Sequence, residues 1–139
     1  MVLSKGFKSF SLLLILMILP QCAEKSSDDY VIQAIEQTGR QEHTQAMESY
    51  LKAIDKDSRN PRAYYGLGGL YNSKEMYTQA EEVIKTALQI DPTYIDAYYT
   101  LGYTYEMMGR KEEAEENFEN YRRLKKRLDE FTKEENESP

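Results

Sequence analysis

Residues 60–92 read NPRAYYGLGGLYNSKEMYTQAEEVIKTALQIDP, and a second copy of their pattern follows at once. Ala63-Tyr64-Tyr65 returns as Ala97-Tyr98-Tyr99, a displacement of 34 positions (97 − 63 = 34). The other residues related by the same displacement are Leu67-Gly68 and Leu101-Gly102, Tyr71 and Tyr105, and Ala80 and Ala114. A constant period of this length is typical of stacked helical repeats.

The spacing inside each copy indicates two helices joined by a turn. Four residues of the first helix are spaced i, i+3, i+4 and i+7, which places them on one face: Tyr64, Leu67, Gly68 and Tyr71. The inner face of the second helix is marked by Ala80, Ile84 and Ala87. The unit is therefore a helix-turn-helix, and the chain is expected to be all-α.

This pattern resembles the tetratricopeptide repeat (TPR). That family places a large aromatic residue, Leu-Gly and Tyr on the first helix, and Ala, an aliphatic or aromatic residue, Ala and Pro on the second. The matching residues here are Tyr64, Leu67-Gly68, Tyr71, Ala80, Ile84, Ala87 and Pro92, with Tyr64 in place of the usual Trp. The resemblance implies a helix-turn-helix solenoid.

The period divides the chain into about three repeats and a C-terminal capping helix. We expect a degenerate first repeat at residues 30–60, a second at 61–94 and a third at 95–128. In the first repeat, the helices are predicted at about 29–38 and at 45–56, because Ala46 and Ala53 lie one period before Ala80 and Ala87.

The last helix is expected to continue past the third repeat. Leu124, Leu128 and Phe131 extend its apolar face, which we interpret as a closing cap. Residues 129–139 hold the end of this helix and a polar tail, which should fray from Lys133 onward.

Short signals mark several helix ends. Asn60-Pro61 is a typical start, since Asn caps free amides and Pro suits the first turn. Residues 93–96 (Thr-Tyr-Ile-Asp) predict a capping box, and Gly109 predicts a C-cap. The family resemblance implies close helix packing at Gly68, whereas Gly66 and Gly69 have no core role that the sequence explains.

The N-terminus has the layout of an export signal. Lys5 and Lys8 precede an apolar run over residues 10–19, which is shorter than the ~20 residues that a bilayer helix needs. The only cysteine, Cys22, follows directly.

This arrangement resembles a bacterial lipoprotein signal. The resemblance implies removal of residues 1–21 as a signal peptide and acylation of Cys22, including palmitate, at the new N-terminus. Pro20 and Gln21 depart from the small residues usual before the cysteine. The polar residues 22–29 would then be a tether, and the protein would be exported and anchored to an envelope membrane by its lipid. The alternatives are ordinary secretion with an incidental cysteine, or an uncleaved anchor.

Composition argues against several functions. The formal net charge of −6 disfavours nucleic acid, which selects clustered Lys and Arg. The single histidine, His43, has no Cys or second His nearby, so neither a metal site nor a cofactor is expected. No catalytic constellation is present, and we expect a protein that is not an enzyme.

Two charged clusters occur near the C-terminus. The acidic cluster (Glu112, Glu113, Glu115 and Glu116) is interpreted as a solvated helix start. The basic cluster (Arg122, Arg123, Lys125, Lys126 and Arg127) is interpreted as the solvent face of the cap, with contact to anionic lipid as the alternative.

In the TPR family, the first helices of successive repeats line a groove that holds a peptide. The groove positions that the resemblance implies here are Arg62, Tyr65, Gly69, Asn72, Ser73, Asp96, Tyr99, Tyr103, Glu106 and Met107. Tyr65 and Tyr99 lie one residue past the core stripe, so we predict an aromatic wall of Tyr65, Tyr99 and Tyr103 over a bare patch left by Gly66 and Gly69.

The resulting functional prediction is a non-enzymatic adaptor or scaffold of the bacterial cell envelope that binds a protein segment in this groove. The alternative is a structural envelope lipoprotein that self-associates through its exposed repeat faces into homo-oligomers.

Overall fold

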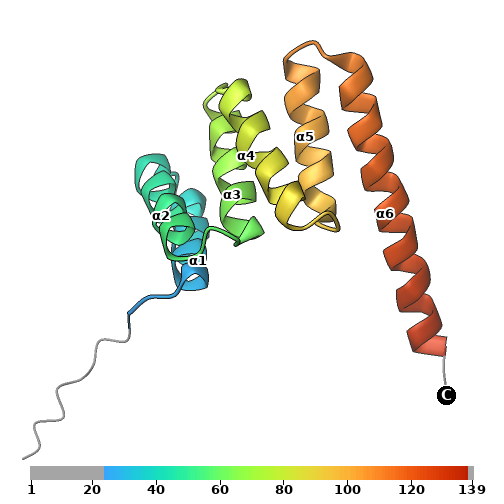
Figure 1. Cartoon of the computed structure of the whole chain (residues 1–139), viewed down its shortest axis with the longest axis horizontal. Helices are drawn as coiled ribbons and strands as arrows, with labels where there is room; N and C mark the ends of the chain where they lie inside the picture. The colour runs from blue at the N-terminus through green and yellow to red at the C-terminus, as the bar shows by residue number, and fades with distance from the viewer. Residues whose placement is uncertain (1–23, 138–139) are drawn as a thin grey trace, which may run out of the picture.

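A computed structural model describes residues 24–137 of the chain, which fold into six α-helices without a strand in that range (Figure 1). The helices are α1 (Ser27–Gly39), α2 (His43–Lys56), α3 (Pro61–Ser73), α4 (Tyr77–Ile90), α5 (Ile95–Met107) and α6 (Lys111–Glu137). Consecutive helices pair as hairpins, and the hairpins stack side by side. The predicted all-α solenoid with a C-terminal helix is confirmed.

The start of α1 shortens the predicted polar tether. Ser26 is the N-cap, and its hydroxyl accepts a hydrogen bond from the Asp29 amide while the Asp29 carboxylate bonds back to the Ser26 amide. This capping box satisfies free amides at the helix start. The prediction of a tether reaching residue 29 is therefore wrong, because residues 27–29 are helical.

The starts of α3 and α5 differ in their chemistry. The Asn60 side chain accepts a hydrogen bond of 3.1 Å from the Arg62 amide, with Pro61 in the first turn, as predicted. The capping box predicted at residues 93–96 does not form, and Tyr94 is the N-cap without a side-chain bond. The helix starts one residue later than predicted, so Thr93 lies outside it, and the Thr93 hydroxyl donates to the Asp91 carboxylate over 2.6 Å.

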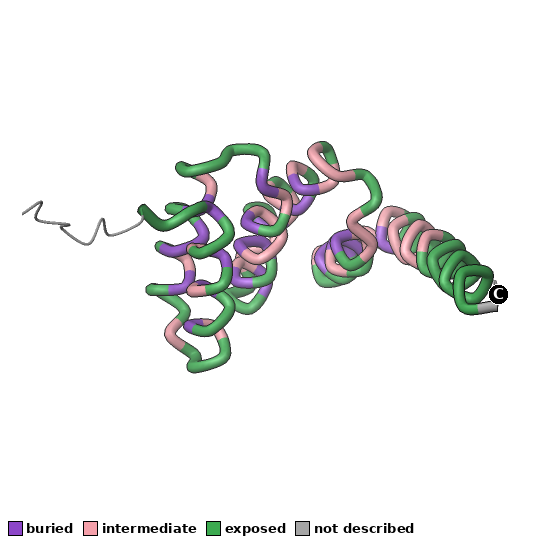
Figure 2. The backbone as a smooth tube through the Cα atoms, turned by 90° about the horizontal axis from the view of Figure 1, so that it is seen from below, coloured by how far each residue is buried: buried purple, intermediate pink, exposed green. Residues whose placement is uncertain are grey.

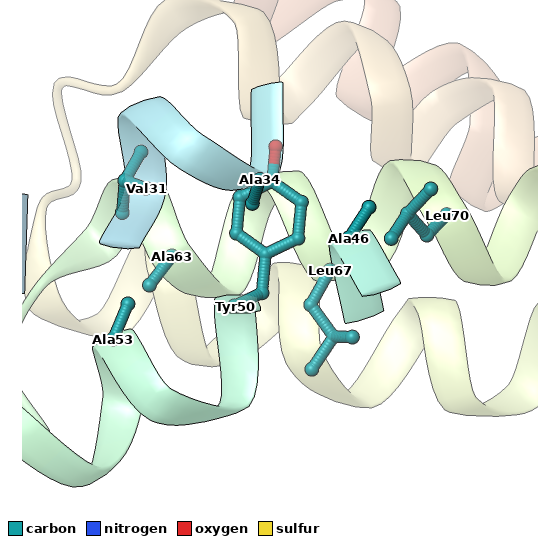
Figure 3. Packing of buried hydrophobic residues seen from close by; sticks show 8 residues of the cluster. All are labelled: Val31, Ala34, Ala46, Tyr50, Ala53, Ala63, Leu67 and Leu70. Carbon is teal, nitrogen blue, oxygen red and sulfur yellow. The ribbon is translucent and has the colours of Figure 1, made fainter. Parts of the chain in front are cut away.

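The buried side chains form two hydrophobic cores. The first core contains Val31, Ala34, Ala46, Tyr50, Ala53, Ala63, Leu67 and Leu70 (Figure 3). The second core contains Ala80, Ile84, Ala97, Leu101, Tyr105 and Ala114. The two helices of the middle hairpin thus contribute to different cores, α3 to the first and α4 to the second. Buried positions line the inner sides of the stacked helices (Figure 2).

The aliphatic residues of the predicted inner stripe are buried, but two of its tyrosines are not. Leu67 and Ile84 are both at most 2 % exposed. Tyr64 and Tyr98, which were expected to fill the core, are only half-buried. The Tyr98 hydroxyl instead donates to the Pro92 carbonyl over 3.1 Å.

Two glycines of α3 allow close packing. A Cβ on Gly68 would lie 2.9 Å or less from two atoms of Ile84, which confirms the predicted role of this small residue. A Cβ on Gly66 would lie 2.5 Å or less from three atoms of the Tyr50 side chain. Gly66 therefore belongs to the contact between α2 and α3. The expectation that it forms a bare patch with Gly69 is wrong.

The final helix is the longest, with 27 residues, and it extends beyond the other helices (Figure 1). The predicted extension is present and continues to Glu137, so the stretch from Lys133 is helical rather than frayed. Leu128 and Phe131 are 51 % and 58 % exposed, so this part of α6 does not close the third repeat as the predicted cap would. Within residues 24–137, no helix combines the length and apolar character needed to cross a membrane.

Candidate functional site

A pocket of about 320 Å³ lies between α3 and α5. We call it the α3–α5 pocket, and it is lined by Gly69, Asn72, Ser73, Tyr99, Thr100 and Tyr103. A Cβ built on Gly69 would have no heavy atom within 4 Å, so the helix backbone is open to the pocket there. The absence of a side chain lets a ligand approach that backbone closely.

The floor of the pocket is a buried polar pair that joins the two helices. The Asn72 amide group donates to the Thr104 hydroxyl over 2.9 Å, and that hydroxyl donates to the Thr100 carbonyl over 2.8 Å. Asn72 is almost fully buried. Buried polar groups bonded in this way fix the position of α3 relative to α5, and hence the shape of the pocket.

The aromatic side of the pocket comes from α5. Tyr103 is exposed, and Tyr99 is 54 % exposed. The Tyr99 ring lies 5.5 Å from the Phe118 ring and 5.3 Å from the Tyr121 ring, measured between centroids, so α6 supports it from behind. Such aromatic contacts orient the exposed ring without covering it.

Tyr65 is not part of this aromatic wall, contrary to the prediction. Its ring packs edge-on against Tyr94 at a centroid distance of 4.9 Å, so Tyr65 belongs to the contact between repeats. Burial raises the pKa of the Tyr94 phenol to about 12. This value is consistent with an apolar contact that keeps the phenol neutral.

The structure brings together half of the ten predicted groove residues. Gly69, Asn72, Ser73, Tyr99 and Tyr103 line the α3–α5 pocket. Arg62 and Asp96 lie exposed in the first turns of α3 and α5, and Arg62 bonds to Asp28 over 3.4 Å. Glu106 lines a different pocket, between α5 and α6, and Met107 is exposed at the end of α5 outside the lining of the α3–α5 pocket.

Thr100 is the lining residue that sequence reasoning missed. It lies three residues before Tyr103, and side chains at that spacing share a helix face. Its hydroxyl donates to the Asp96 carbonyl over 3.0 Å. The same helix-face spacing could have identified it.

The chemistry of the pocket is that of a binding surface. Its lining offers two phenol rings, an exposed helix backbone and small hydroxyl groups, and it contains no carboxylate, amine or guanidinium. His43 is exposed at the start of α2, and no cluster of three or more His, Cys, Asp or Glu able to hold a metal occurs within residues 24–137.

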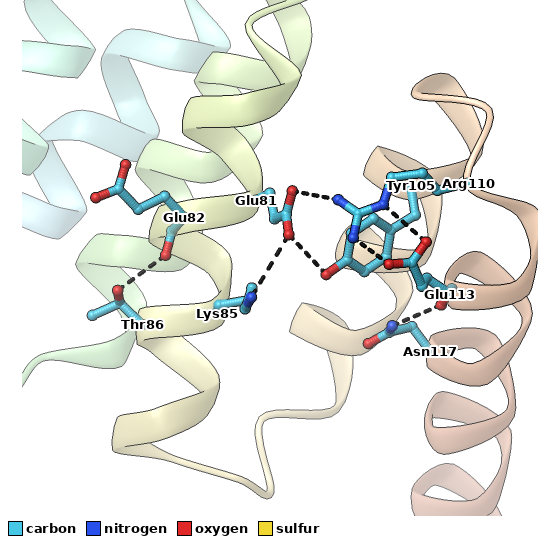
Figure 4. Close-up of polar contacts among 8 residues, drawn as sticks. All are labelled: Glu81, Glu82, Lys85, Thr86, Tyr105, Arg110, Glu113 and Asn117. Atoms are coloured by element: carbon cyan, nitrogen blue, oxygen red, sulfur yellow. Dashed lines mark hydrogen bonds and ion pairs between the residues drawn. The ribbon is translucent and has the colours of Figure 1, made fainter.

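A charged network connects the second repeat to the third (Figure 4). Glu81 accepts hydrogen bonds from Arg110 over 2.8 Å and from the Tyr105 hydroxyl over 3.0 Å. Arg110 also pairs with Glu113 and stacks on the Tyr105 ring at 4.4 Å. Burial and the bond to Glu81 raise the pKa of Tyr105 to about 12. The network holds α4 against α5 and the start of α6, on the side away from the α3–α5 pocket lining.

Stacked antiparallel helix pairs with a 34-residue period define a helical repeat protein. Three family models identify the particular repeat. A TPR repeat model matches residues 39–74, and two tetratricopeptide repeat models match residues 61–94 and 83–116. Together they extend over residues 39–116, and the chain therefore belongs to the tetratricopeptide repeat family.

Solved structures share this fold. The crystal structure of MamA is 27 % identical with a TM-score of 0.71, and the match covers 76 % of this chain but only 61 % of MamA. The second TPR of Spaghetti (RPAP3), bound to the HSP90 peptide SRMEEVD, is 21 % identical (TM-score 0.70; 72 % of this chain and 93 % of that one).

The Sgt2 TPR domain from Aspergillus fumigatus is 23 % identical, with a TM-score of 0.68 and coverage of 71 % of this chain and 66 % of that one. At these identities, the likeness to Spaghetti and to Sgt2 shows the fold alone. A comparison with curated protein sequences found no significant match.

Proposed function

We propose that this protein is a non-enzymatic adaptor that binds a segment of another protein in the α3–α5 pocket. The observation that carries the proposal is the pocket itself, in which exposed Tyr99 and Tyr103 face an open backbone at Gly69 above a fixed polar floor. Exposed aromatic side chains in a preformed concavity are typical anchors for protein ligands. The structures of Spaghetti with an HSP90 peptide support a peptide-binding role for this fold.

The pocket chemistry specifies the ligand. A volume of about 320 Å³ suits one large apolar or aromatic side chain with its neighbouring backbone. No Lys or Arg lines the pocket, so nothing there neutralises a ligand carboxylate. The expected ligand is therefore an internal apolar segment of a partner protein rather than a free C-terminus. Arg62 and Asp96, in the first turns of α3 and α5, add charges of opposite sign near one end of these helices.

Gly69→Leu tests the pocket. The new side chain would fill the pocket, and it meets no heavy atom within 4 Å at its Cβ, so folding should be preserved. A photo-crosslinking amino acid at position 103 first captures the partner in the native cells. The captured protein is then titrated against purified variants. Gly69→Leu is expected to weaken binding by about tenfold or more, as loss of a good anchor does.

The matched control is Gly39→Leu. Gly39 also has no atom within 4 Å of its would-be Cβ, but it lies at the end of α1, away from the pocket lining. It should bind the partner as the native chain does. If both variants bound the partner with equal affinity, binding in the α3–α5 pocket would be refuted. If only Gly69→Leu had a lower melting temperature, its loss of binding would be assigned to a loss of folding.

We also propose that the adaptor is a lipoprotein of the bacterial envelope, anchored through Cys22, which lies outside the described residues. The supporting observations are the apolar run over residues 10–19 and the position of the only cysteine directly after it. Cys22→Ser should move the protein from the detergent phase to the aqueous phase in membrane fractionation, because the acyl chains are lost. Ser26→Cys in the Cys22→Ser background is the control and should not restore anchoring. Unchanged partitioning of Cys22→Ser would contradict the lipid anchor.

A further inference from the structure

The contact between the second and third repeats uses positions that recur in the third repeat, where no further helix pair within residues 24–137 covers them. In the second repeat, Tyr65 packs against Tyr94, and Asn72 bonds to Thr104. Glu81 bonds to Arg110. One period later, the corresponding residues of the third repeat are Tyr99, Glu106 and Glu115. We call the surface formed by Tyr99, Glu106, Glu115, Phe118 and Tyr121 the end face.

Side chains of the end face are exposed at positions where the equivalent side chains of the second repeat are buried. Ile84, the counterpart of Phe118, is fully buried, whereas Phe118 is only partly buried, and Tyr99 is mostly exposed. A pocket of about 210 Å³ lies beside Phe118, and its lining residues are Glu106, Lys111, Ala114, Glu115 and Phe118. An apolar surface whose counterpart in the second repeat is covered is therefore available to another molecule at this end.

Within residues 24–137, the continuation of α6 does not fold back over the end face. Leu128 lies one period after Tyr94, and a fourth helix pair would place it against Tyr99. Instead α6 continues without a turn to Glu137, and Leu128 is exposed.

The charges of the end face specify its partner. The Asn72–Thr104 pair is neutral, but Glu106 at the equivalent position is exposed and forms no ion pair within residues 24–137. Glu115 is exposed and bonds to Arg122 of its own helix over 2.7 Å. Basic side chains on an incoming helix would complement both carboxylates, as Arg110 complements Glu81 in the interior.

A second copy of this chain does not fit in the repeat register. If the first repeat of a second copy stacked on the end face as a fourth repeat, its Glu36 would take the position equivalent to Thr104. Its Glu42 would take the position equivalent to Arg110, since each lies two periods earlier (104 − 68 = 36 and 110 − 68 = 42). Carboxylates would then face Glu106 and Glu115. Like charges brought together at an interface disfavour association.

We infer that the end face binds an amphipathic helix of a different protein, which carries an aromatic residue near its start and basic residues opposite Glu106 and Glu115. This partner would sit where a fourth repeat would otherwise begin. The end face shares only Tyr99 with the lining of the α3–α5 pocket, and with both sites filled the adaptor would hold two ligands. Tyr99 borders both surfaces.

The test uses two synthetic peptides of residues 92–111, the segment that covers the second repeat. The first carries Thr104→Lys and keeps Arg110. The second carries Thr104→Glu and Arg110→Glu. Each is titrated by fluorescence anisotropy against the purified full-length chain and against its Glu106→Lys/Glu115→Lys variant. The basic peptide should bind the native chain at least tenfold more tightly than the acidic one, and the order should reverse with the variant.

Location and independence are checked separately. Amide NMR shifts on binding should fall on Ala114, Phe118 and Tyr121, not on Gly69 and Ser73. The Gly69→Leu chain should bind the basic peptide with the same affinity as the native chain. Each proposal can therefore fail without refuting the other. The inference is overturned if neither peptide binds, if charge reversal has no effect, if the shifts fall in the α3–α5 pocket, or if sedimentation shows a dimer that already covers Phe118.

Discussion

Leu67→Ala is expected to lower the free energy of unfolding by roughly 2–5 kcal/mol, the range for large-to-small changes in a packed core. Leu67 is 2 % exposed and lies in the first core between the helices of two repeats. Its removal leaves a cavity that neighbouring alanines cannot fill. Small domains are stable by only about 5–15 kcal/mol, so the variant should unfold at a much lower urea concentration than the native chain. Circular dichroism monitors this unfolding.

Leu51→Ala provides the matched control. Leu51 is also a leucine within a helix, in α2, but it is 49 % exposed. The same chemical change should therefore alter stability by less than about 1 kcal/mol, since surface substitutions usually have small effects. If the two variants lost stability equally, the assignment of Leu67 to the core would be wrong.

Gly66→Ala is expected to destabilise the fold by about 1–3 kcal/mol, although alanine is the better helix former by about 1 kcal/mol. The cause is steric, because the new methyl group would overlap the Tyr50 side chain, which is itself buried. Gly69→Ala, three residues further along the same helix, meets nothing and should stabilise by up to about 1 kcal/mol. Urea unfolding of the two variants should thus give opposite signs.

A double-mutant cycle isolates the contact. In a Tyr50→Ala background the obstacle is gone, so Gly66→Ala should become neutral or stabilising, with a coupling between the two sites of about 0.5–3 kcal/mol. Additive effects would show that Gly66 is needed for a reason other than Tyr50.

Gly66 and Gly69 also show where sequence reasoning stops. Both stand in the same Gly-Leu-Gly-Gly segment of one helix, and helix propensity treats them alike. Only the position of Tyr50, 16 residues earlier in the most degenerate repeat, separates them. Gly68 could be predicted because the Leu-Gly pair recurs in the next copy as Leu101-Gly102, and Gly102 likewise faces a helix neighbour, Phe118.

The period was sufficient to predict the helices, because most of the buried alanines recur at the same interval. It was less informative for the groove. Tyr65 and Tyr99 are equivalent in sequence, yet Tyr65 packs against Tyr94 at the start of α5, whereas no further helix pair within residues 24–137 covers Tyr99. The exposure of a residue in a repeat thus depends on whether another helix pair packs against it. The local sequence pattern does not carry this information. The capping box predicted at residues 93–96 fails because α5 begins one residue later, with Tyr94 as its N-cap.

The two cores divide the molecule differently from its repeats. The first is built by α1, α2 and α3, and the second by α4, α5 and α6, so the seam between them lies within the middle hairpin, at residues 74–76. Three half-buried side chains, Tyr65, Tyr71 and Val83, reach across it. Recombination between related genes would keep each core whole if the crossover fell in this turn. A crossover at residues 57–60 or 91–94, where the repeats meet, would combine core residues from two parents. The unit that such recombination could exchange with its core intact is therefore a set of three helices, bounded by the turn in the middle of the second repeat.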